Sequence, residues 1–235
     1  MNGDRTGPTR RLTWLPGVLF LVGAWLAAST LDTVLEFTPG DIIQWDDHAF
    51  GDLTTYRLVE HDGREAVHAR CRDGAASGLY TAREVDLERT PVMEWSWRVE
   101  ETLQGVDERT REGDDYAARV YVIVRHRILR WRTRAINYVW AGEQPAGADW
   151  PNAYNPRAHM VAVRSGTEPH VGRWHTERRN VGDDWRRFHD RETERLTHVA
   201  IMTDCDDAGR SLEAWYGSIR FLPDDRDAGL GIGPE

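Results

Sequence analysis

The chain of 235 residues carries a formal net charge of −9, and 40% of its residues are hydrophobic. This length suits one generous domain preceded by a targeting segment. The acidic balance argues against a nucleic-acid partner, because phosphate contacts need a basic stripe on the protein surface.

The first thirty residues have the composition of an export signal. The basic n-region contains three arginines, Arg5, Arg10 and Arg11. Residues 12–31 carry no charge, and the small residues 27–29 would suit a signal peptidase, so we expect a signal peptide over 1–29. The alternative is an uncleaved membrane anchor, since about 20 apolar residues can span a bilayer. Pro16 and Gly17 shorten the apolar core and favour cleavage.

An exported chain is expected in the periplasm or cell envelope, where nucleotide cofactors are not supplied. No second apolar run of comparable length follows, so the rest of the chain is expected to be soluble. Membrane contact is therefore expected only through the N-terminal segment, and only if that segment is retained.

After the signal, polar and apolar side chains alternate in short runs, which is typical of β-strands. Asp62-Gly63 predicts a hairpin turn between strands at 56–59 and 65–71. The run at 93–99 is expected to bury one face, formed by Met93, Trp95, Trp97 and Val99. Its other face carries Glu94, Ser96 and Arg98.

The run at 116–124 has apolar side chains on both faces and is expected to be a central strand. Val120, Val122 and Val124 point one way, and Arg119, Tyr121 and Ile123 point the other. Further strands are expected at 135–141, 159–164, 174–181, 197–203 and 212–221. In the last of them, Trp215 aligns with Ile219 and Phe221 and is expected in the core. A short helix is expected at 184–194.

These nine or ten strands between Trp45 and Phe221 predict an all-β fold. The expected architecture is an antiparallel, jelly-roll-like β-sandwich, preceded by the N-terminal hydrophobic signal helix. We expect the sandwich domain over 42–222 and a disordered tail over 223–235.

The two cysteines, Cys71 and Cys205, both fall on apolar strand faces. In an oxidising envelope compartment they could form a disulfide. They could equally remain two buried thiols, because two cysteines define no spacing pattern.

Polar residues on the outward faces of the central strands form the first candidate ligand surface. If these strands are neighbours, Glu94, Arg119 and Asn137 would form, with Tyr121, a surface able to hold a polyhydroxylated or anionic ligand. The alternative is an ordinary solvated sheet with a cross-strand ion pair between Glu94 and Arg119.

The loop at 150–156 is the second candidate. Trp150 and Tyr154 flank Asn152 in this loop. Exposed aromatic rings stack on the faces of sugars, and asparagine amides form hydrogen bonds with hydroxyl groups. The loop could instead fold back and plug one end of the sandwich, which we favour because loop aromatics are commonly buried.

Acidic clusters at Asp114-Asp115 and at 204–209 give a third candidate. Asp204 opens a run that resembles the start of a calcium loop. The fifth position of that run is Ala208 and the twelfth is Trp215, so it fails as an EF-hand. We therefore expect no metal centre or other cofactor, and a structural calcium is left as the open alternative.

A catalytic role has weaker support than a binding role. Hydrolysis would need two carboxylates at a fixed separation, and the candidates are Glu94, Asp114, Glu177 and Asp204. The sequence places no two of them together. It also contains no nucleophile-elbow, zinc, phosphate-loop or dinucleotide motif. A non-catalytic binding module is therefore favoured over a hydrolase or lyase.

Several strings of the chain together resemble one known family. They are AASGLY (75–80), WSWRV (95–99), GDDYAARVYV (113–122), INYVWA (136–141), RNV (179–181), AIMTD (200–204) and YGSIRF (216–221). The family is the bacterial domain of unknown function called DUF3047, and the resemblance extends over residues 45–221. Cys71, Cys205 and Ser218 depart from its pattern, so a disulfide would be particular to this protein.

The resemblance implies an exported bacterial protein and brings no known activity. The closing string, 216–221, is similar to the last strand of carbohydrate-binding jelly rolls. Asn180 is a further candidate ligand residue, and a shared site would require it to converge with Asp114, Arg119 and Asn137. The leading hypothesis is an envelope module that binds a glycan or another polar ligand. The alternatives are a carbohydrate-active hydrolase or lyase and a structural or partner-binding envelope protein.

Overall fold

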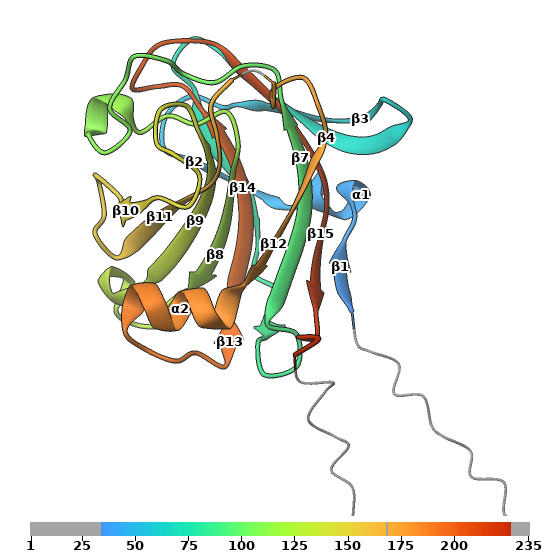
Figure 1. Cartoon of the computed structure of the whole chain (residues 1–235), viewed down its shortest axis with the longest axis vertical. Coiled ribbons are helices and arrows are strands. Elements are labelled where there is room, and N and C mark those ends of the chain that lie inside the picture. Colours follow the sequence, from blue (N-terminus) through green and yellow to red (C-terminus); the bar gives the residue numbers. More distant parts are fainter. Residues whose placement is uncertain (1–33, 168, 227–235) are drawn as a thin grey trace, which may run out of the picture. The chain divides into compact units, whose positions relative to one another are not determined.

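The computed structural model describes residues 34–167 and 169–226 of the chain (Figure 1). The predicted signal peptide at 1–29 and the final part of the predicted tail, 227–235, lie outside these residues. Within the described part, no helix combines the length and the apolar character needed to cross a bilayer.

Two β-sheets pack face to face and make up most of the described chain (Figure 1). In spatial order, the six-stranded sheet contains β12 (His175–Asn180), β7 (Val92–Val99), β15 (Leu212–Leu222), β4 (Arg64–Cys71) and β3 (Thr55–His61), with β1 (Leu35–Phe37) also paired to β15. The seven-stranded sheet contains β10 (Asp149–Pro151), β11 (Ala158–Ser165), β9 (Arg134–Ala141), β8 (Arg119–Val124), β14 (His198–Asp204), β5 (Ala76–Thr81) and β2 (Asp46–Ala49). The predicted all-β, jelly-roll-like sandwich is confirmed.

The sandwich contains more strands than the nine or ten expected. β1, β2 and β10 are too short to show an alternating pattern, and β5 shows none because its first four residues are all buried. β6 (Val85–Asp86) and β13 (Arg195–Leu196) form a further, separate pair. One pairing also departs from the antiparallel arrangement, since β9 and β11 run parallel. The chain must therefore cross from the end of β9 back to the start of β11 through residues 142–157. This crossover contains the loop at 150–156.

The aromatic core predicted from period-two alternation lies between the two sheets. Trp95 and Trp97 of β7 are at most 1% exposed. They meet Tyr138 and Trp140 of the opposite sheet at ring-centroid distances of 5.3 and 6.0 Å respectively. The hairpin at Asp62-Gly63 is also confirmed, since it joins β3 to β4 with both turn residues at positive φ.

Trp215 is buried, at 8% exposed, but it packs outside the inter-sheet core cluster in which it was expected. A register shift between Tyr216 and Ile219 interrupts the alternation of β15. Ile219 therefore points into the core, whereas Trp215 lies on the outer face and stacks on His68 with ring centroids 4.6 Å apart. A bulge in a strand moves the residues on its two sides onto opposite faces.

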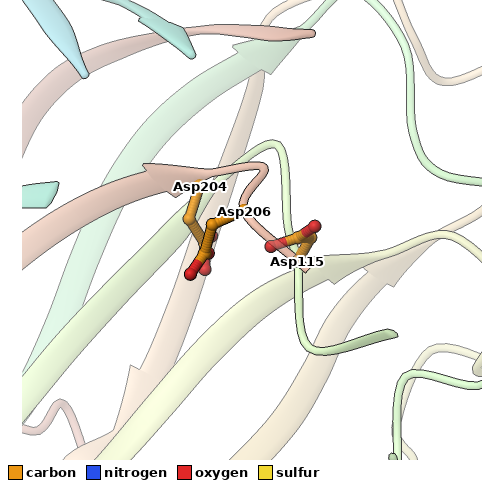
Figure 2. A group of neighbouring side chains, drawn as sticks. All are labelled: Asp115, Asp204 and Asp206. Atoms are coloured by element: carbon orange, nitrogen blue, oxygen red, sulfur yellow. The ribbon is translucent and has the colours of Figure 1, made fainter. Parts of the chain in front are cut away.

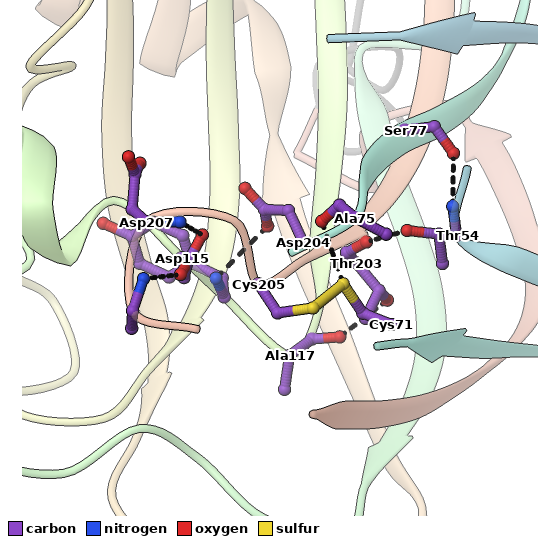
Figure 3. The surroundings of a disulfide bond; sticks show 12 residues. Thr54, Cys71, Ala75, Ser77, Asp115, Ala117, Thr203, Asp204, Cys205 and Asp207 are labelled. Carbon is purple, nitrogen blue, oxygen red and sulfur yellow. Dashed lines mark hydrogen bonds between the residues drawn. A yellow bond between two sulfur atoms is a disulfide. The ribbon is translucent and has the colours of Figure 1, made fainter. Parts of the chain in front are cut away.

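Cys71 and Cys205 form a disulfide, which resolves the alternative that the sequence leaves open. Cys71 ends β4 and Cys205 follows β14, so the bond joins the two sheets (Figure 3). Both side chains are fully buried. Because Cys205 directly follows Asp204, the bond also fixes the beginning of the acidic run at 204–209.

The described domain extends beyond the predicted limits of 42–222 at both ends. β1 lies before residue 42 and pairs with β15, and α1 (Pro39–Ile42) follows it. At the other end, Asp224 accepts hydrogen bonds from Asn180 Nδ2 at 2.6 Å and from Arg226 Nε at 2.9 Å. Residues 223–226 of the predicted disordered tail are therefore held against the domain.

α2 (Val181–His189) replaces the helix expected at 184–194. It begins earlier because the Asn180 side chain accepts a hydrogen bond from a first-turn N–H at 2.9 Å. It ends earlier because Asp190 adopts the left-handed conformation, with φ of 49°. Within the helix, Asp184 accepts a hydrogen bond from the Tyr138 hydroxyl at 2.8 Å, which ties α2 to the seven-stranded sheet.

His189, at the end of α2, makes the stability of the domain dependent on pH. Burial lowers the pKa of its imidazole to about 4, although Nε2 lies 3.2 Å from the carbonyl oxygen of Ala135. Between pH 6.5 and pH 4 the unfolded state binds a proton that the folded state does not. The contribution of His189 to stability is therefore complete above pH 6.5 and is lost as the pH falls through about 4.

We expect the wild-type protein to lose about 2 kcal/mol more unfolding free energy than His189→Gln between roughly pH 7 and pH 4.5. Urea denaturation at the two pH values measures this difference. Glutamine keeps a donor for the Ala135 carbonyl and removes the titration. Parallel pH dependence in the two proteins would show that His189 is not responsible.

Candidate functional site

A groove with a volume of about 540 Å³ runs across the outer face of the seven-stranded sheet. Strands β2, β5, β8, β9 and β14 form its floor, and the crossover loop between β9 and β11 forms one side. We call it the polar groove. Its principal side chains are Asp114, Arg119, Tyr121, Asn137, Asn152, Tyr154, Asp204, Asp206 and Asp207.

Strand alternation explains why polar side chains reach this face. On β8, Val120 and Val122 point into the core and are fully buried, whereas Arg119 and Tyr121 line the polar groove. The antiparallel register then places Asn137 of β9 opposite Tyr121. The predicted division of β8 into a valine face and an Arg-Tyr face is confirmed.

Arg119 is the central charged group of the polar groove, and it is only 3% exposed. Its Nε donates to Asp204 Oδ1 at 2.8 Å, and its Nη2 donates to Asp204 Oδ2 and to the backbone carbonyl of Asp114. The guanidinium also lies over the Tyr116 ring, 4.4 Å from its centroid. Burial opposes the charge of Arg119, but the neighbouring acidic groups, of which Asp204 contributes most, together outweigh it and raise the pKa of the guanidinium well above its usual value. Arg119 is therefore a fixed positive charge.

Asn137 places an amide with an unsatisfied oxygen on the floor of the polar groove. The side chain is 2% exposed. Its Nδ2 contacts Met160 Sδ at 3.0 Å, while its Oδ1 has no hydrogen-bond partner among the described residues. A buried polar atom without a partner costs roughly 1–3 kcal/mol. A hydroxyl donor that enters the groove would remove this cost.

Trp150 is a buried anchor of the crossover loop. It is 5% exposed and packs in a small apolar cluster with Tyr116 and Met160. This arrangement agrees with the favoured alternative, in which the loop folds back onto the sandwich. Trp150 is therefore not available as a stacking surface for a sugar.

Asn152 and Tyr154 of the same loop do reach the polar groove. Asn152 Nδ2 donates to both carboxylate oxygens of Asp114, at 3.1 and 2.8 Å. Tyr154 is 51% exposed, and its hydroxyl donates to Asp207 Oδ1 at 2.5 Å. These bonds connect the crossover loop to acidic residues on both neighbouring segments, so the loop forms a fixed wall of the groove.

Three carboxylates lie close together at one end of the polar groove. Asp115, Asp204 and Asp206 each bring one oxygen within 4.8 Å of the others (Figure 2). Asp115 already accepts from two backbone N–H groups of the run at 204–209, at 3.3 and 2.5 Å (Figure 3). Asp204 is already held by Arg119. A structural calcium here stays the open alternative to the expected absence of a metal. A higher melting temperature after CaCl2 is added to the chelator-treated chain would support it, and an unchanged one would contradict it.

Asp206 and Asp207 lie at the rim of the polar groove, and both have raised pKa values. Burial is the main cause for Asp206, followed by the like charges of Asp207 and Asp115. Burial also raises the pKa of Asp207, and the hydrogen bond from Tyr154 acts against it. The groove contains more carboxylates than its single arginine can balance, namely Asp114, Asp204, Asp206 and Asp207. Its net charge is therefore negative.

Glu94 lies away from the polar groove, which corrects the first predicted ligand surface. It belongs to β7 of the six-stranded sheet and accepts from Arg220, whereas Arg119 and Asn137 belong to the opposite sheet. The surface that was to join these residues is not formed. The alternative ion pair between Glu94 and Arg119 is also wrong, because β7 and β8 are not neighbours.

Glu177 and Asn180 also have positions outside the polar groove. Glu177 Oε1 accepts from Trp97 Nε1 at 3.1 Å and from Arg164 Nε at 2.7 Å, so it joins the two sheets at one edge. Asn180 caps α2. Of the residues expected to share a site, Asp114, Arg119 and Asn137 do line the polar groove together, and Asp204 lines it with them. Of the four carboxylates considered for hydrolysis, only Asp114 and Asp204 share the groove.

His48, Phe50 and Met202 line the polar groove without having been predicted. β2, which carries His48, has every residue exposed, so its sequence has no alternating pattern to reveal it as a strand. Phe50 is 70% exposed. The aromatic rings at 48 and 50, which stand between two acidic residues and a glycine, are the sequence feature that could have indicated this side of the groove.

The family comparison covers most of the chain. The model of a family described as "Protein of unknown function (DUF3047)" matches residues 43–220. No curated protein shows a significant match to the chain.

Similar solved structures have low sequence identity to the chain. The glycoside hydrolase domain of Endo-D from Streptococcus pneumoniae R6 has 7% identity and a TM-score of 0.40, and it covers 77% of this chain, which spans 22% of that one. TmCBM61 in complex with β-1,4-galactotriose has 9% identity and a TM-score of 0.36, covering 77% of this chain and 90% of that one. A thermostable cellulase derived from Cel12A of Rhodothermus marinus has 11% identity and a TM-score of 0.42. The match covers 79% of this chain and 99% of that one.

Proposed function

This chain belongs to the DUF3047 family of proteins of unknown function, and from its own side chains we propose that the polar groove binds a neutral, polyhydroxylated ligand such as a glycan. Hydrogen bonds to fixed amide and carboxylate groups hold the ligand, and aromatic rings pack against its apolar faces. The proposal concerns binding alone and includes no covalent step.

The buried amide of Asn137 is the observation that carries this proposal. The residue lines the polar groove, and its Oδ1 is buried and has no hydrogen-bond partner among the described residues. A sugar hydroxyl can donate to such an oxygen and accept from another group at the same time. Folding leaves the amide oxygen buried without a hydrogen bond, which costs free energy. A ligand that donates to this oxygen removes that cost, and the gain adds to the binding free energy.

Aromatic side chains support a ligand that has apolar faces as well as polar edges. Tyr121 lies on the floor, and Phe50 and Tyr154 lie at the rim. Burial raises the pKa of Tyr121, so its hydroxyl stays neutral. Rings that remain exposed beside polar groups, as Phe50 and Tyr154 do, suit the packing of pyranose rings.

The charge of the polar groove supports a neutral ligand over an anionic one. Burial raises the pKa values of Asp206 and Asp207, and neighbouring carboxylates raise them further. An anion would add to this repulsion, and the charge of Arg119 is already engaged by Asp204. Carboxylates accept hydrogen bonds from neutral sugar hydroxyls without this cost.

Replacing Asn137 by alanine tests the proposed ligand contact. A glycan array with the full chain first identifies a neutral ligand, and calorimetry then measures its affinity. We expect Asn137→Ala to weaken binding about tenfold, since it removes one hydrogen bond to a buried acceptor. Thr176→Ala, on the opposite sheet, is the matched control and is expected to bind as the wild type does. Absence of neutral ligands from the array, or equal affinity in Asn137→Ala, would refute the proposal.

Hydrolysis of the same glycan is a second candidate function. The raised pKa values of Asp206 and Asp207 favour it, because a general acid must hold its proton near the working pH. Incubating the bound glycan with the chain separates the two candidates. New reducing ends that disappear in Asp206→Asn or Asp207→Asn would establish hydrolysis, and an intact glycan would exclude it.

We also propose that the protein acts in the periplasm or cell envelope. The uncharged stretch at 12–31 with small residues at 27–29 supports export. The Cys71–Cys205 disulfide suits an oxidising compartment. Mass spectrometry of the mature N-terminus distinguishes cleavage from a retained anchor, and recovery of the chain only from the cytosol would contradict export.

A further inference from the structure

The loop that joins β8 to β9 is strongly basic, although the chain as a whole is acidic. This loop and the first residue of β9, residues 125–134, which we call the basic loop, contain five arginines and no carboxylate, in a chain with a formal net charge of −9. The arginines are Arg125, Arg127, Arg130, Arg132 and Arg134. The polar groove uses none of them.

The charges of the basic loop are not neutralised within the domain. Among residues 34–167 and 169–226, none of its five arginines forms an ion pair with a carboxylate. Arg157 and Arg191 lie close enough to Arg134 to disfavour its charge, and these two arginines also form no ion pair in that part of the chain. The Nη1 of Arg134 lies near a neutral partner, His189 Nδ1, at 3.5 Å. The result is a concentrated patch of unneutralised positive charge.

Two large apolar side chains project from the same loop. Ile128 is 83% exposed and Trp131 is 66% exposed. Local hydrogen bonds fold the loop, since His126 Nδ1 accepts from the Leu129 N–H at 3.0 Å and the Leu129 carbonyl accepts from the Arg132 N–H at 2.8 Å. The exposed side chains therefore project from a folded turn that includes a short 3-10 helix at Arg130–Arg132.

The basic loop lies at the end of the sandwich where the chain enters the described domain. Arg134 contacts α2 through His189. The last residue of β12, just before α2, pairs with the first residue of β7. The last residue of β15 pairs with that same residue of β7, and the first residue of β1 pairs with β15 directly beside it. β1 therefore begins at the same end of the sandwich as α2. Figure 1 shows α2 and the loop between β8 and β9 at this end. The first described residue, Val34, directly precedes β1 at the end that carries the basic loop.

We propose that the basic loop docks the domain on the surface of an anionic phospholipid bilayer. Its arginines bind lipid phosphates, and Trp131 and Ile128 insert among the headgroups. Tryptophan favours the membrane interface, and arginine side chains can reach phosphates from an apolar neighbourhood. An acidic polysaccharide would complement the charge and could stack on Trp131, but it gives no role to the exposed aliphatic side chain of Ile128. This contact is additional to the one predicted for the N-terminal segment, and it does not depend on the polar groove.

The test compares vesicles of phosphatidylcholine alone with vesicles that also contain phosphatidylglycerol. The full chain is mixed with each at low salt, and two quantities are measured: its partition coefficient, and amide hydrogen exchange in residues 125–134. Hydrogen exchange in residues 125–134 reports on the basic loop itself, even where the N-terminal segment also binds lipid. We expect anionic vesicles to slow exchange in the basic loop. We also expect Arg127→Gln/Arg130→Gln/Arg132→Gln to lower the charge-dependent partition about 100-fold, since each arginine near an anionic surface contributes roughly fivefold.

A triple variant elsewhere on the domain provides a matched control. Arg57→Gln/Arg109→Gln/Arg173→Gln removes the same charge from arginines that form no ion pair among residues 34–167 and 169–226. It is expected to partition as the wild type does. A comparable loss in this control would overturn the proposal, because the attraction would then depend on net charge alone. Equal loop exchange with both vesicle types would also overturn it, as would protection by an acidic polysaccharide but not by anionic lipid.

Discussion

Arg119→Met is expected to lower the free energy of unfolding by about 3–5 kcal/mol. Arg119 is 3% exposed, and its removal leaves the buried carboxylates of Asp204 and Asp114 without their cation. Methionine fills much of the same volume, so the loss reflects unpaired charge rather than a cavity. Chemical denaturation followed by fluorescence measures the change.

An exposed ion pair on the opposite sheet provides the comparison for this prediction. Arg220→Met breaks the pair with Glu94, in which the arginine side chain is 45% exposed, and should cost less than about 1 kcal/mol. Adding Asp204→Asn to Arg119→Met should recover part of the loss, because it removes one of the two stranded charges. If Arg119→Met costs no more than Arg220→Met, the buried network does not stabilise the fold.

Loss of the Cys71–Cys205 disulfide is expected to cost about 2–5 kcal/mol. The two cysteines are 134 residues apart in sequence, so the bond closes a long loop in the unfolded chain. Loop-closure entropy alone gives an upper figure of about 5 kcal/mol for a loop of this length. Chemical denaturation of Cys71→Ala/Cys205→Ala, compared with the wild type without reductant, measures the cost.

Thiol titration of the unfolded wild-type chain provides the control. It should detect no free thiol without reductant and two after reduction. The double alanine variant also tests whether the bond positions the acidic run at 204–209. Unchanged stability in that variant, or free thiols in the unreduced chain, would show that the bond does not support the fold.

Alternation along single strands made the core predictable from sequence. Trp95 and Trp97 were expected to face inward, and both are buried against the opposite sheet. The two faces of β8 were also predicted correctly, with Val120 inside and Arg119 outside the core. Both predictions depend only on the geometry of one strand, whose side chains alternate between two faces.

The pairing of strands was not predictable, because alternation does not identify a strand's neighbours. Glu94 and Arg119 have the same alternating context, yet their strands belong to different sheets. The parallel pairing of β9 with β11 has no signature in either strand alone. Trp215 shows a further limit, since the bulge beyond Tyr216 reverses the face inferred from Ile219.

The candidate site was predicted in part for a related reason. Asp114, Arg119, Asn137 and Asp204 were selected as polar residues on or beside outward-facing strands, and they do share one groove. Their burial could not be inferred, because it depends on contacts between segments far apart in sequence, such as those of Asp114 with Asn152 and of Arg119 with Asp204. The basic loop was visible in the sequence as five arginines in ten residues. Its meaning depends on the absence of ion pairs between these arginines and carboxylates of the described residues, which only the folded arrangement reveals.

The burial of the groove's polar side chains has a consequence for the entropy of binding. Asp114, Arg119, Asn137 and Asp204 are each at most 5% exposed without any ligand, so their rotamers are already fixed when the chain folds. A ligand would then lose its own freedom but would not have to order these groups. Selectivity should therefore be strict, because rigid acceptors cannot rearrange to suit a misplaced hydroxyl. Variants that merely loosen this array would weaken binding through added disorder, even where they touch no ligand atom.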